Sequence, residues 1–307
     1  MTPISSSDPS SSPTIPSFIE EVIGWDEYTN GPSTGYIGME PSGTMHLGYL
    51  LQFRALRWLE EQGIQMTVLF ADLHARMNQK GSIEQIRSHA QEMQREFERW
   101  GIRVRFLQGS EMINADYLLA ITNVCDRISL ARFRRTLTIQ GREEAYLDEN
   151  PLSLLYAMMQ LTDIFDLDVD LCLSGMDQRR IHVLAREIAP RLSRVAPTLV
   201  HLRLLNDLRA QGGKMSKSFP EHAILLNDSP EEIRRKIRKA FLAPGSSNST
   251  LFDIVRWILP SGTITIEQEQ MDADQLIEQN ELRQLDPNVF KIAISEALID
   301  LLQTRQL

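Results

Sequence analysis

Residues 35–50 read Gly-Tyr-Ile-Gly-Met-Glu-Pro-Ser-Gly-Thr-Met-His-Leu-Gly-Tyr-Leu, and this stretch combines a strand, a glycine-lined turn and a helix start. Tyr36 and Ile37 favour a strand, a cluster of glycine, proline and serine then breaks it, and the apolar run after Gly48 predicts a helix. Such a unit presents free backbone N–H groups and the positive end of a helix dipole, which suit a phosphate. Taken alone, His46 in this turn is better explained as a surface histidine in an ordinary connection.

Length and composition are those of an ordinary soluble protein of two domains. The chain has 307 residues, of which 42% are hydrophobic, and can bury a full core. No apolar run is as long as a membrane span and no export signal is visible, so we expect a cytoplasmic protein without a membrane partner. Cys125 and Cys172 lie far apart in sequence, as expected of reduced thiols. The net charge of −9 requires any nucleic acid to be held by local basic patches.

Strands and helices alternate as far as residue 205, which predicts an α/β fold with a doubly wound, Rossmann-like parallel sheet. Ligands of such sheets gather at the carboxyl ends of the strands. Residues 1–16 are rich in serine and proline and are expected to form a disordered tail, and residues 18–25 have the apolar spacing of a short amphipathic helix. The expected strands cover 67–70, 102–107, 169–173 and 198–204, and the expected helices cover 83–100, 152–165 and 176–188.

The strand pattern ends after Phe219, which predicts a C-terminal all-α domain over residues 220–307. The sequence Ser-Pro-Glu-Glu at 229–232 predicts a helix that begins with a capping box. This helix has an apolar side and a cationic side. The cations fit either contact with a phosphate backbone or a solvated helix face. They are Arg234, Arg235, Lys236, Arg238 and Lys239.

Residues 212–218, Gly-Gly-Lys-Met-Ser-Lys-Ser, form a second glycine-led loop. Its two lysines and two hydroxyls are what a segment that closes over a polyphosphate needs. It is not a Walker loop, because Met215 follows Lys214 where serine or threonine would stand.

The expected helix at 152–165 carries Tyr156, Gln160 and Asp163 at spacings of four and three. This spacing places the three polar side chains on one helix face. They either satisfy each other in the core or line a polar pocket. The histidines of the chain form no metal-ligand motif, so we expect no metal held by the protein.

Pro-Ser-Gly-x-x-His-x-Gly at 41–48 and Lys-Met-Ser-Lys-Ser at 214–218 together resemble the paired signatures of class I aminoacyl-tRNA synthetases. Four further segments are similar to tyrosyl-tRNA synthetases of the archaeal and eukaryotic type. The resemblance runs from about residue 36 to residue 241, and more weakly to the end. The four segments begin at Tyr36, Ala71, Met159 and Gly175.

The resemblance implies a tyrosine–tRNA ligase, which activates L-tyrosine with ATP and transfers it to tRNA. In that family the residues matching Tyr36 and Asp163 bond the phenol of the substrate, and those matching Tyr156, Gln160 and Gln178 hold its amino group. This chain has the matching side chain at all five places. A site built around a buried hydroxyl can reject the analogue that lacks it by up to ~10⁵-fold.

The same resemblance implies how ATP is held. His46 would donate to the α-phosphate, Lys214 and Lys217 would hold the β- and γ-phosphates, and Mg²⁺ would be carried by the nucleotide. Gly38 and Gly48 would let the backbone approach the nucleotide. Met215 and Ser216 complete the ATP-binding loop.

The implied organisation is a catalytic domain at 17–219 and a helical tRNA-binding (anticodon) domain at 220–307. Residues 110–150 form an arginine-rich helical region through which family members form homodimers. Its arginines fit a solvated surface or an RNA-facing one. The residues expected near the acceptor end of tRNA are Arg132, Arg179 and Arg180.

This sequence departs from the family pattern at three places. Tyr49 stands where the first signature normally ends in a second histidine, and a phenol cannot become cationic. Asp286 and Val289 occupy the segment that reads the anticodon, where neither stacking nor the usual contact with guanine is available to them. Lys217, often serine in the archaeal type, follows the general class I form and does not indicate lost activity.

Two other functions fit parts of the sequence. One is a paralogue that keeps the tyrosine pocket but has changed its RNA partner or lost charging. The other is a nucleotidylyltransferase of the His-x-Gly-His type, which shares the phosphate turn but requires neither Tyr36 with Asp163 nor a basic helical domain. Tyrosine-dependent pyrophosphate exchange, followed by charging of total tRNA, separates these functions.

Overall fold

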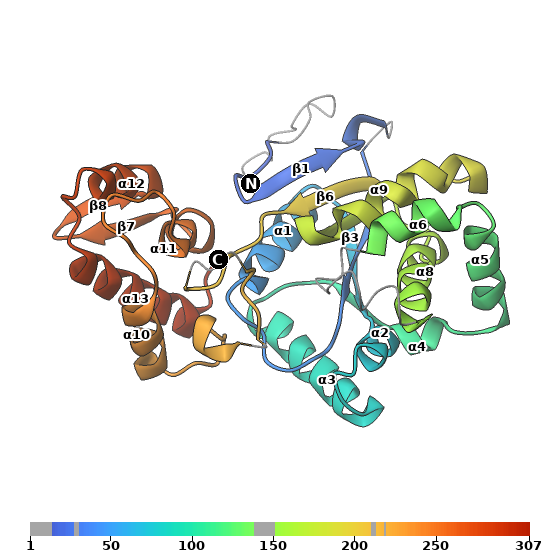
Figure 1. Ribbon diagram of the computed structural model, residues 1–307, viewed down its shortest axis with the longest axis horizontal. Helices are drawn as coiled ribbons and strands as arrows, with labels where there is room; N and C mark the ends of the chain where they lie inside the picture. The colour runs from blue at the N-terminus through green and yellow to red at the C-terminus, as the bar shows by residue number, and fades with distance from the viewer. Residues whose placement is uncertain (1–13, 28–30, 138–150, 210–212, 218) are drawn as a thin grey trace, which may run out of the picture.

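The computed structural model describes residues 14–27, 31–137, 151–209, 213–217 and 219–307 (Figure 1). Its main sheet has the strand order β1-β6-β5-β2-β3-β4, in which β1 is antiparallel to β6 and every other pair is parallel. This confirms the predicted Rossmann-like α/β class. The six strands are β1 (Ile19–Ile23), β2 (Thr34–Met39), β3 (Gln65–Phe70), β4 (Arg105–Gln108), β5 (Leu171–Gly175) and β6 (Thr198–Leu202).

The strand order changes direction between β2 and β5. From β2 the chain winds outward through β3 to β4, and it then returns to the other side of β2 to form β5 and β6. Connections that leave two neighbouring strands in opposite directions open a crevice at their carboxyl ends, and this crevice is the usual ligand site of such sheets.

Strand β1 replaces the amphipathic helix predicted for residues 18–25, so that prediction was wrong. Phe18 and Ile19 are buried as expected, but residues 19–23 pair with the edge of β6. The exposed edge of β6 offers backbone hydrogen-bond partners, and a short segment with Ile19, Val22 and Ile23 meets them as a strand. The predicted tail at 1–16 falls mostly outside the described residues.

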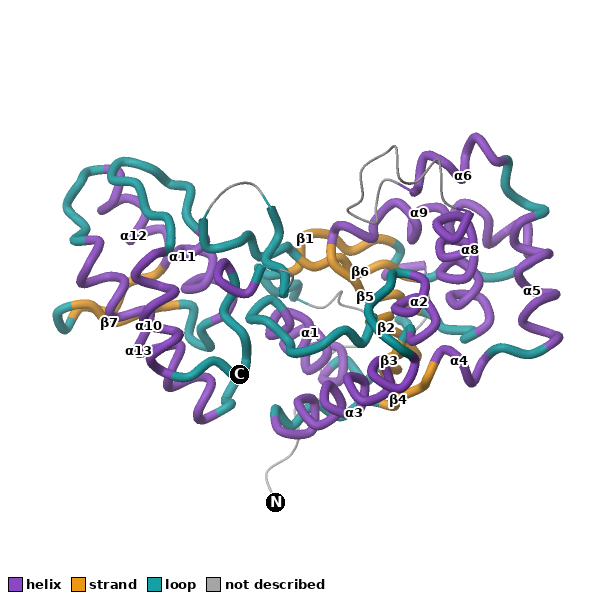
Figure 2. The backbone as a smooth tube through the Cα atoms, turned by 60° about the horizontal axis from the view of Figure 1, so that its bottom comes forward, coloured by secondary structure: helices purple, strands orange, loops and turns teal. Residues whose placement is uncertain are grey.

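Helices cover both faces of the sheet (Figure 2). Alternate strand residues point to opposite faces, so that Ile37 and Met39 pack with the helices of one face while Tyr36 and Cys172 pack with those of the other. The first face carries α1 (Tyr49–Glu61) and α3 (Ile83–Arg99), and the second carries α8 (Pro151–Asp166) and α9 (Arg179–Ile188). The shorter helices of this domain are α2 (Asp72–Met77), α4 (Gly109–Met112), α5 (Ala115–Cys125) and α6 (Leu130–Leu137).

The C-terminal lobe is not all-α, which corrects the prediction for residues 220–307. It contains an antiparallel hairpin of β7 (Thr263–Ile266) and β8 (Glu269–Asp272). The hairpin turn is made by Glu267 and Gln268, both with positive φ, instead of the usual Asn-Gly. The turn therefore lacks a sequence signal. The lobe's helices are α10 (Pro230–Lys239), α11 (Thr250–Asp253), a π-helical turn (Ile254–Ile258), α12 (Ala273–Glu281) and α13 (Pro287–Thr304).

Helix α10 begins with the predicted capping box, in which Ser229 and Glu232 satisfy each other's backbone N–H. Its cationic side is only partly solvated. Lys236 is buried and its ammonium donates to Asp228 at 2.6 Å, while Arg234 and Arg235 form ion pairs with carboxylates of the same lobe. The cations of α10 are thus partly neutralised by the lobe itself.

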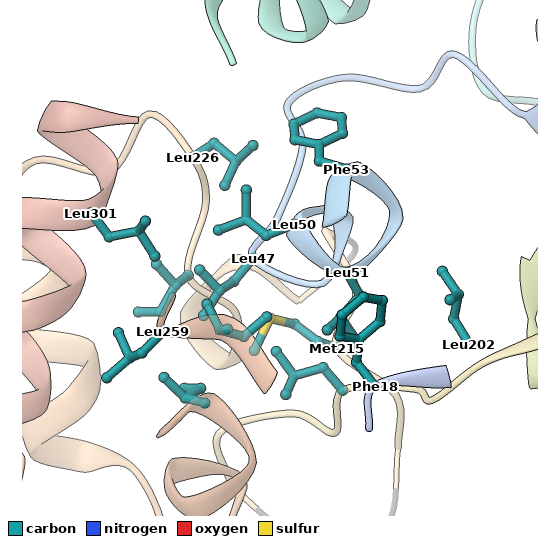
Figure 3. Packing of buried hydrophobic residues seen from close by; sticks show 14 of the residues in the cluster. Phe18, Leu47, Leu50, Leu51, Phe53, Leu202, Met215, Leu226, Leu259 and Leu301 are labelled. Carbon is teal, nitrogen blue, oxygen red and sulfur yellow. The ribbon is translucent and has the colours of Figure 1, made fainter. Parts of the chain in front are cut away.

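One hydrophobic cluster runs through both lobes (Figure 3). Leu47 and Met215 belong to the sheet domain, and Leu259 and Leu301 belong to the C-terminal lobe, yet all four lie in this cluster. Helix α1 also bonds the second lobe directly, because the Arg54 guanidinium donates to the Trp257 carbonyl at 2.6 Å.

Candidate active site

A cavity of about 490 Å³ lies at the carboxyl ends of β2 and β5, where the strand order reverses. It contains all five side chains expected to bind the amino acid. They come from the middle of β2, from α8 and from the turn before α9. These side chains are Tyr36, Tyr156, Gln160, Asp163 and Gln178.

Tyr36 and Asp163 face this same cavity and are both almost fully buried. The hydroxyl of Tyr117 on α5 donates to the Asp163 carboxylate at 2.5 Å. Burial raises the pKa of Asp163 to about 7, and the hydrogen bond from Tyr117 opposes that rise. Burial also holds the pKa of Tyr36 well above its ordinary value, so its phenol stays neutral. A buried acid beside a neutral phenol can bond a substrate hydroxyl. Sequence reasoning missed Tyr117, which lies in none of the recognised motifs.

A second polar group of the cavity surrounds Tyr156. The Tyr156 hydroxyl donates to Glu40 at 2.7 Å, and Glu40 also accepts a hydrogen bond from the Asn78 amide. The ring of His74 meets the ring of Tyr156 edge-on at 4.5 Å. Nearby, the Gln160 amide donates to the Gln178 amide oxygen at 3.0 Å. Carboxylate, phenol and amide oxygens together suit an ammonium group.

Glu40, His74 and Asn78 were not singled out from the sequence, although they lie inside two of the segments that carry the family resemblance. Glu40 is the residue that follows β2, and His74 lies on α2, directly after β3. Their position after buried strands was the available signal, since side chains at that edge of the sheet meet the ligand.

A smaller cavity of about 180 Å³ adjoins the first and contains His46 and Gly48. The Gly48 N–H donates to Nδ1 of His46 at 3.1 Å, which places the ring proton on Nε2. Burial, with the nearby charges of Lys217 and Lys214, lowers the pKa of His46 to about 3. His46 is therefore a neutral hydrogen-bond donor throughout the physiological range. The structure favours this role over the surface histidine that His46 alone suggested.

The two predicted glycines differ in what they accommodate. A Cβ on Gly48 would come within 2.9 Å of Cε1 and 3.0 Å of Nδ1 of His46, which is too close for a real contact. A Cβ on Gly38 would lie 3.7 Å from the Tyr36 ring, an ordinary distance. Gly48 is therefore required by the protein itself. Gly38 lines the larger cavity and constrains only what binds there.

The loop of Lys214 and Lys217 lies beside both cavities. Lys214 forms an ion pair with Asp177, another residue that the sequence did not suggest. The Lys217 ammonium is buried without a hydrogen-bond partner in the described residues, 5.9 Å from the centre of the Tyr49 ring. Burial lowers the pKa of Lys217 to about 8, assisted by the charge of Lys80. A buried ammonium without a partner favours an incoming anion.

The remaining residues of this loop have separate positions. Met215 is buried in the core shared by the two lobes, and its N–H donates to the Leu205 carbonyl at 2.7 Å. Ser216 lines the larger cavity. Met215 therefore anchors the loop between its two lysines.

The three arginines predicted for tRNA lie outside the cavity lining. Arg132 donates to Glu187 through two nitrogens, and Arg179 does the same with Glu21. Arg180 is exposed at the start of α9.

The departures from the family pattern have structural explanations. Tyr49 lines both cavities, and the centre of its ring lies 4.9 Å from that of His46 in an edge-to-face arrangement. Burial raises the pKa of Tyr49 to about 12, so its phenol is neutral. Asp286 caps α13 by accepting from the Asn288 and Val289 N–H groups. Val289 packs against the core. Asp286 and Val289 thus stabilise the helix and the lobe.

The thiols of Cys125 and Cys172 are free. Across the described ranges, no group of three or more histidine, cysteine and carboxylate side chains is arranged to hold a metal ion. Within the same residues, every helix is too short or too polar to cross a bilayer.

Comparison with known families gives a match to the tRNA synthetases of class I (W and Y) over residues 28–303. Among curated proteins, the tyrosine–tRNA ligase of Picrophilus torridus is 37% identical over 92% of this chain and 94% of its own length. The tyrosine–tRNA ligase of Methanocaldococcus jannaschii is 34% identical over 93% of this chain and 92% of its own.

Solved structures agree. The tyrosyl-tRNA synthetase of Aeropyrum pernix has a TM-score of 0.85 at 35% identity and covers 94% of this chain and 90% of its own. The tyrosyl-tRNA synthetase of Archaeoglobus fulgidus, solved with L-tyrosine, has a TM-score of 0.83 at 35% identity and covers 94% and 95% of the two chains.

Proposed function

Since the chain belongs to the class I tRNA synthetases of the tryptophan and tyrosine family, we propose that it is a tyrosine–tRNA ligase that forms tyrosyl-adenylate and transfers the tyrosyl group to tRNA. The observation that carries this proposal is the shared position of Tyr36 and Asp163 in one buried cavity. Phenylalanine in this site would offer no hydrogen bond to Tyr36 or to Asp163, whose carboxylate would keep only the bond from Tyr117, and that cost selects the phenol.

The amino group of tyrosine would be held by Tyr156, Gln160 and Gln178. In support, these three polar side chains line the same cavity as the phenol site, and the Gln160 amide already bonds Gln178. Glu40 adds a negative charge that attracts an ammonium. The substrate carboxylate is then directed toward the smaller cavity.

In the first step, a carboxylate oxygen of tyrosine forms a bond to the α-phosphorus of ATP as the bond to pyrophosphate breaks. His46 would donate from Nε2 to the α-phosphate, and its neutral state supports this role. Lys214 and Lys217 would hold the β- and γ-phosphates, so Lys214 must exchange Asp177 for phosphate. Gly38, Gly48, Met215 and Ser216 would complete the ATP site. We expect Mg²⁺ to arrive with the triphosphate.

In the second step, the terminal ribose hydroxyl of tRNA attacks the adenylate carbonyl and AMP leaves. Arg180, which is exposed, would contact the acceptor end together with Arg132 and Arg179. Arg132 and Arg179 would exchange their carboxylate partners for phosphate. We place the catalytic domain at 17–219 and the tRNA-binding lobe at 220–307, in a cytoplasmic protein.

We also propose a homodimer through the region near 110–150. Five leucines on α5, α6 and α8 have more than a third of their surface exposed, whereas most other large apolar side chains of this domain are buried. Exposed apolar side chains gathered in one region favour contact with a partner surface. A Leu119→Glu variant should be monomeric by light scattering, whereas Ile292→Glu, a control in the other lobe, should not change the mass. The leucines are Leu118, Leu119, Leu130, Leu152 and Leu155.

Pyrophosphate exchange tests the function. ATP and labelled pyrophosphate should exchange with L-tyrosine and not with phenylalanine or tryptophan, and total tRNA should then be charged. Exchange without charging would instead identify a paralogue that activates tyrosine but no longer charges tRNA. This alternative is specific to the chain because Asp286 and Val289, in the segment expected to read the anticodon, cap α13 and pack against the core. Equal exchange with phenylalanine would overturn the assignment of the phenol site.

A further inference from the structure

We propose that Glu21, on the antiparallel edge strand β1, is a positioning residue for the amino-acid pocket. Its carboxylate binds both His201 and Arg179. Through His201 it orients His182 in the cavity wall, and through Arg179 it orients the neighbouring Gln178. The inference rests on the proposed function, because it concerns how the tyrosine site keeps its shape.

The connection is a continuous chain of hydrogen bonds. Nδ1 of His201 lies 3.0 Å from Oε2 of Glu21, and Nε2 of His201 lies 3.3 Å from Nδ1 of His182. The two ring centres lie 5.4 Å apart and the ring planes are 26° from parallel. His182 lines the 490 Å³ cavity, so the chain joins the sheet edge to the ligand site. Both histidines are buried, at 2% and 0% exposure for His182 and His201.

The partners determine where the protons lie. A carboxylate accepts hydrogen bonds only, so the Glu21 bond requires the proton of His201 on Nδ1. Nε2 of His201 is then an acceptor, and the donor of the next bond is Nδ1–H of His182, which also lies 3.3 Å from the Ser174 hydroxyl; that hydroxyl donates to the Gly175 carbonyl and can accept here. His182 therefore keeps its lone pair on Nε2. Burial lowers the pKa of both imidazoles, that of His182 to about 3, which keeps both rings neutral as this arrangement needs.

The Arg179 branch works through the backbone. The Arg179 guanidinium donates from Nε at 2.7 Å and from Nη2 at 2.8 Å to the two oxygens of Glu21. This two-point contact fixes the orientation of the guanidinium. Arg179 is the first residue of α9 and directly follows Gln178, whose amide oxygen accepts from Gln160. Glu21 thus holds the turn that presents Gln178 to the cavity.

The pairing of β1 with β6 accounts for the position of Glu21. Glu21 is in register with His201 on β6, so the strand pairing brings the carboxylate beside the imidazole. Glu20, its neighbour in sequence, forms an ion pair with Arg203 instead. Two adjacent glutamates on one edge strand therefore lead to different places: Glu21 connects to the wall of the 490 Å³ cavity, whereas Arg203, the partner of Glu20, lines the 180 Å³ cavity.

The test compares Glu21→Ala, Glu21→Gln and Glu20→Ala in the full chain. We expect Glu21→Ala to raise the KM for tyrosine in pyrophosphate exchange about tenfold, as for a lost hydrogen bond to a charged group, with kcat and the KM for ATP little changed. The KM for tyrosine of Glu21→Gln should lie between those of Glu21→Ala and the native chain, because the amide oxygen still accepts a hydrogen bond from His201. Glu20→Ala, which also removes an ion pair from β1, should leave the KM for tyrosine unchanged.

Nitrogen-15 NMR of the histidines supplies a readout independent of activity. The native chain should show His182 and His201 both protonated on Nδ1, and Glu21→Ala should give a mixture of tautomers. Equal effects of Glu21→Ala and Glu20→Ala on the tyrosine KM, or unchanged tautomers in Glu21→Ala, would overturn the inference. If the native chain bound no tyrosine at all by calorimetry, the proposed function would fail, whereas the tautomers would still test the chain of hydrogen bonds.

Discussion

The hydroxyl of Tyr117 reaches from α5 to the carboxylate of Asp163 on α8 and donates to it at 2.5 Å. Asp163 is thereby held in place by a residue that the recognised motifs do not contain. The bond also opposes the effect of burial on the pKa of Asp163. Under the proposed function, selectivity for the phenol of tyrosine would depend on Tyr117 as well as on Tyr36 and Asp163.

Tyr117→Phe removes this donor and leaves the ring in place. We expect the pKa of Asp163 to rise above its value of about 7, because the bond that lowered it is gone. The KM for tyrosine should increase about tenfold to a hundredfold, and discrimination against phenylalanine should fall. Steady-state exchange with each amino acid measures both quantities. Thr122→Val, which removes an exposed hydroxyl from the same helix, is the control; an equal effect there would contradict the prediction.

Asp163→Asn should stabilise the protein while it destroys the phenol site. The pKa of Asp163 rises from 3.8 to about 7 on folding, so between these values the folded chain binds a proton that the unfolded chain has released. The free energy of unfolding therefore falls as pH rises through this window, by on the order of 4 kcal/mol. Melting curves at pH 5 and pH 8 should show that the variant gains most at pH 8. A lower Tm than the native chain at pH 8 would refute this account.

Gly48→Ala should displace His46 in the free protein, because the added methyl group would meet the imidazole at 2.9 Å. Adenylate formation should slow about 100-fold to 1,000-fold, as for loss of one transition-state donor, while tyrosine binds normally. Gly38→Ala is the matched comparison, since its methyl group meets only ordinary contacts in the protein. The NMR signals of His46 should move in Gly48→Ala alone. Unchanged signals in Gly48→Ala would show that the turn can adapt.

Lys217 should impose an alkaline limit on ATP use. Its pKa is about 8, because its ammonium is buried, and above that pH the lysine loses the charge that attracts phosphate. The kcat/KM for ATP, which reports on the free enzyme, should therefore decline above pH 8. Lys217→Arg keeps its charge at these pH values, so its profile should stay level to higher pH. The same decline in both proteins would assign the titration to another group.

Sequence periodicity predicted most of the sheet domain correctly because buried strands and amphipathic helices have distinct spacings. Helix α3, with its apolar stripe and final Gly101, is an example. The errors came from contacts that no local pattern encodes. β1 forms because β6 offers an open edge, and the β7–β8 hairpin turns on Glu267 and Gln268, which give no turn signal.

The sequence predicted those site residues that lie in recognisable motifs, and it missed those that reach the site only through tertiary contacts. His46, Lys214 and the five residues expected to bind the amino acid lie in recognisable segments, and the five lie together in one cavity. Tyr117 contacts Asp163 from α5, which carries none of these segments, and Asp177 contacts Lys214 from the segment that begins at Gly175. Glu21 reaches the site only through Arg179 and His201. Their roles depend on partners 37 or more residues away along the chain.

The hydrophobic cluster that runs through both lobes has a consequence for dissection of the protein. Cutting the chain after residue 219 would bare the apolar side of α1 and remove the carbonyl that Arg54 bonds. The sheet domain would then aggregate when expressed alone. In the intact chain, calorimetry should record one cooperative endotherm, so a ligand of either lobe protects the other against heat.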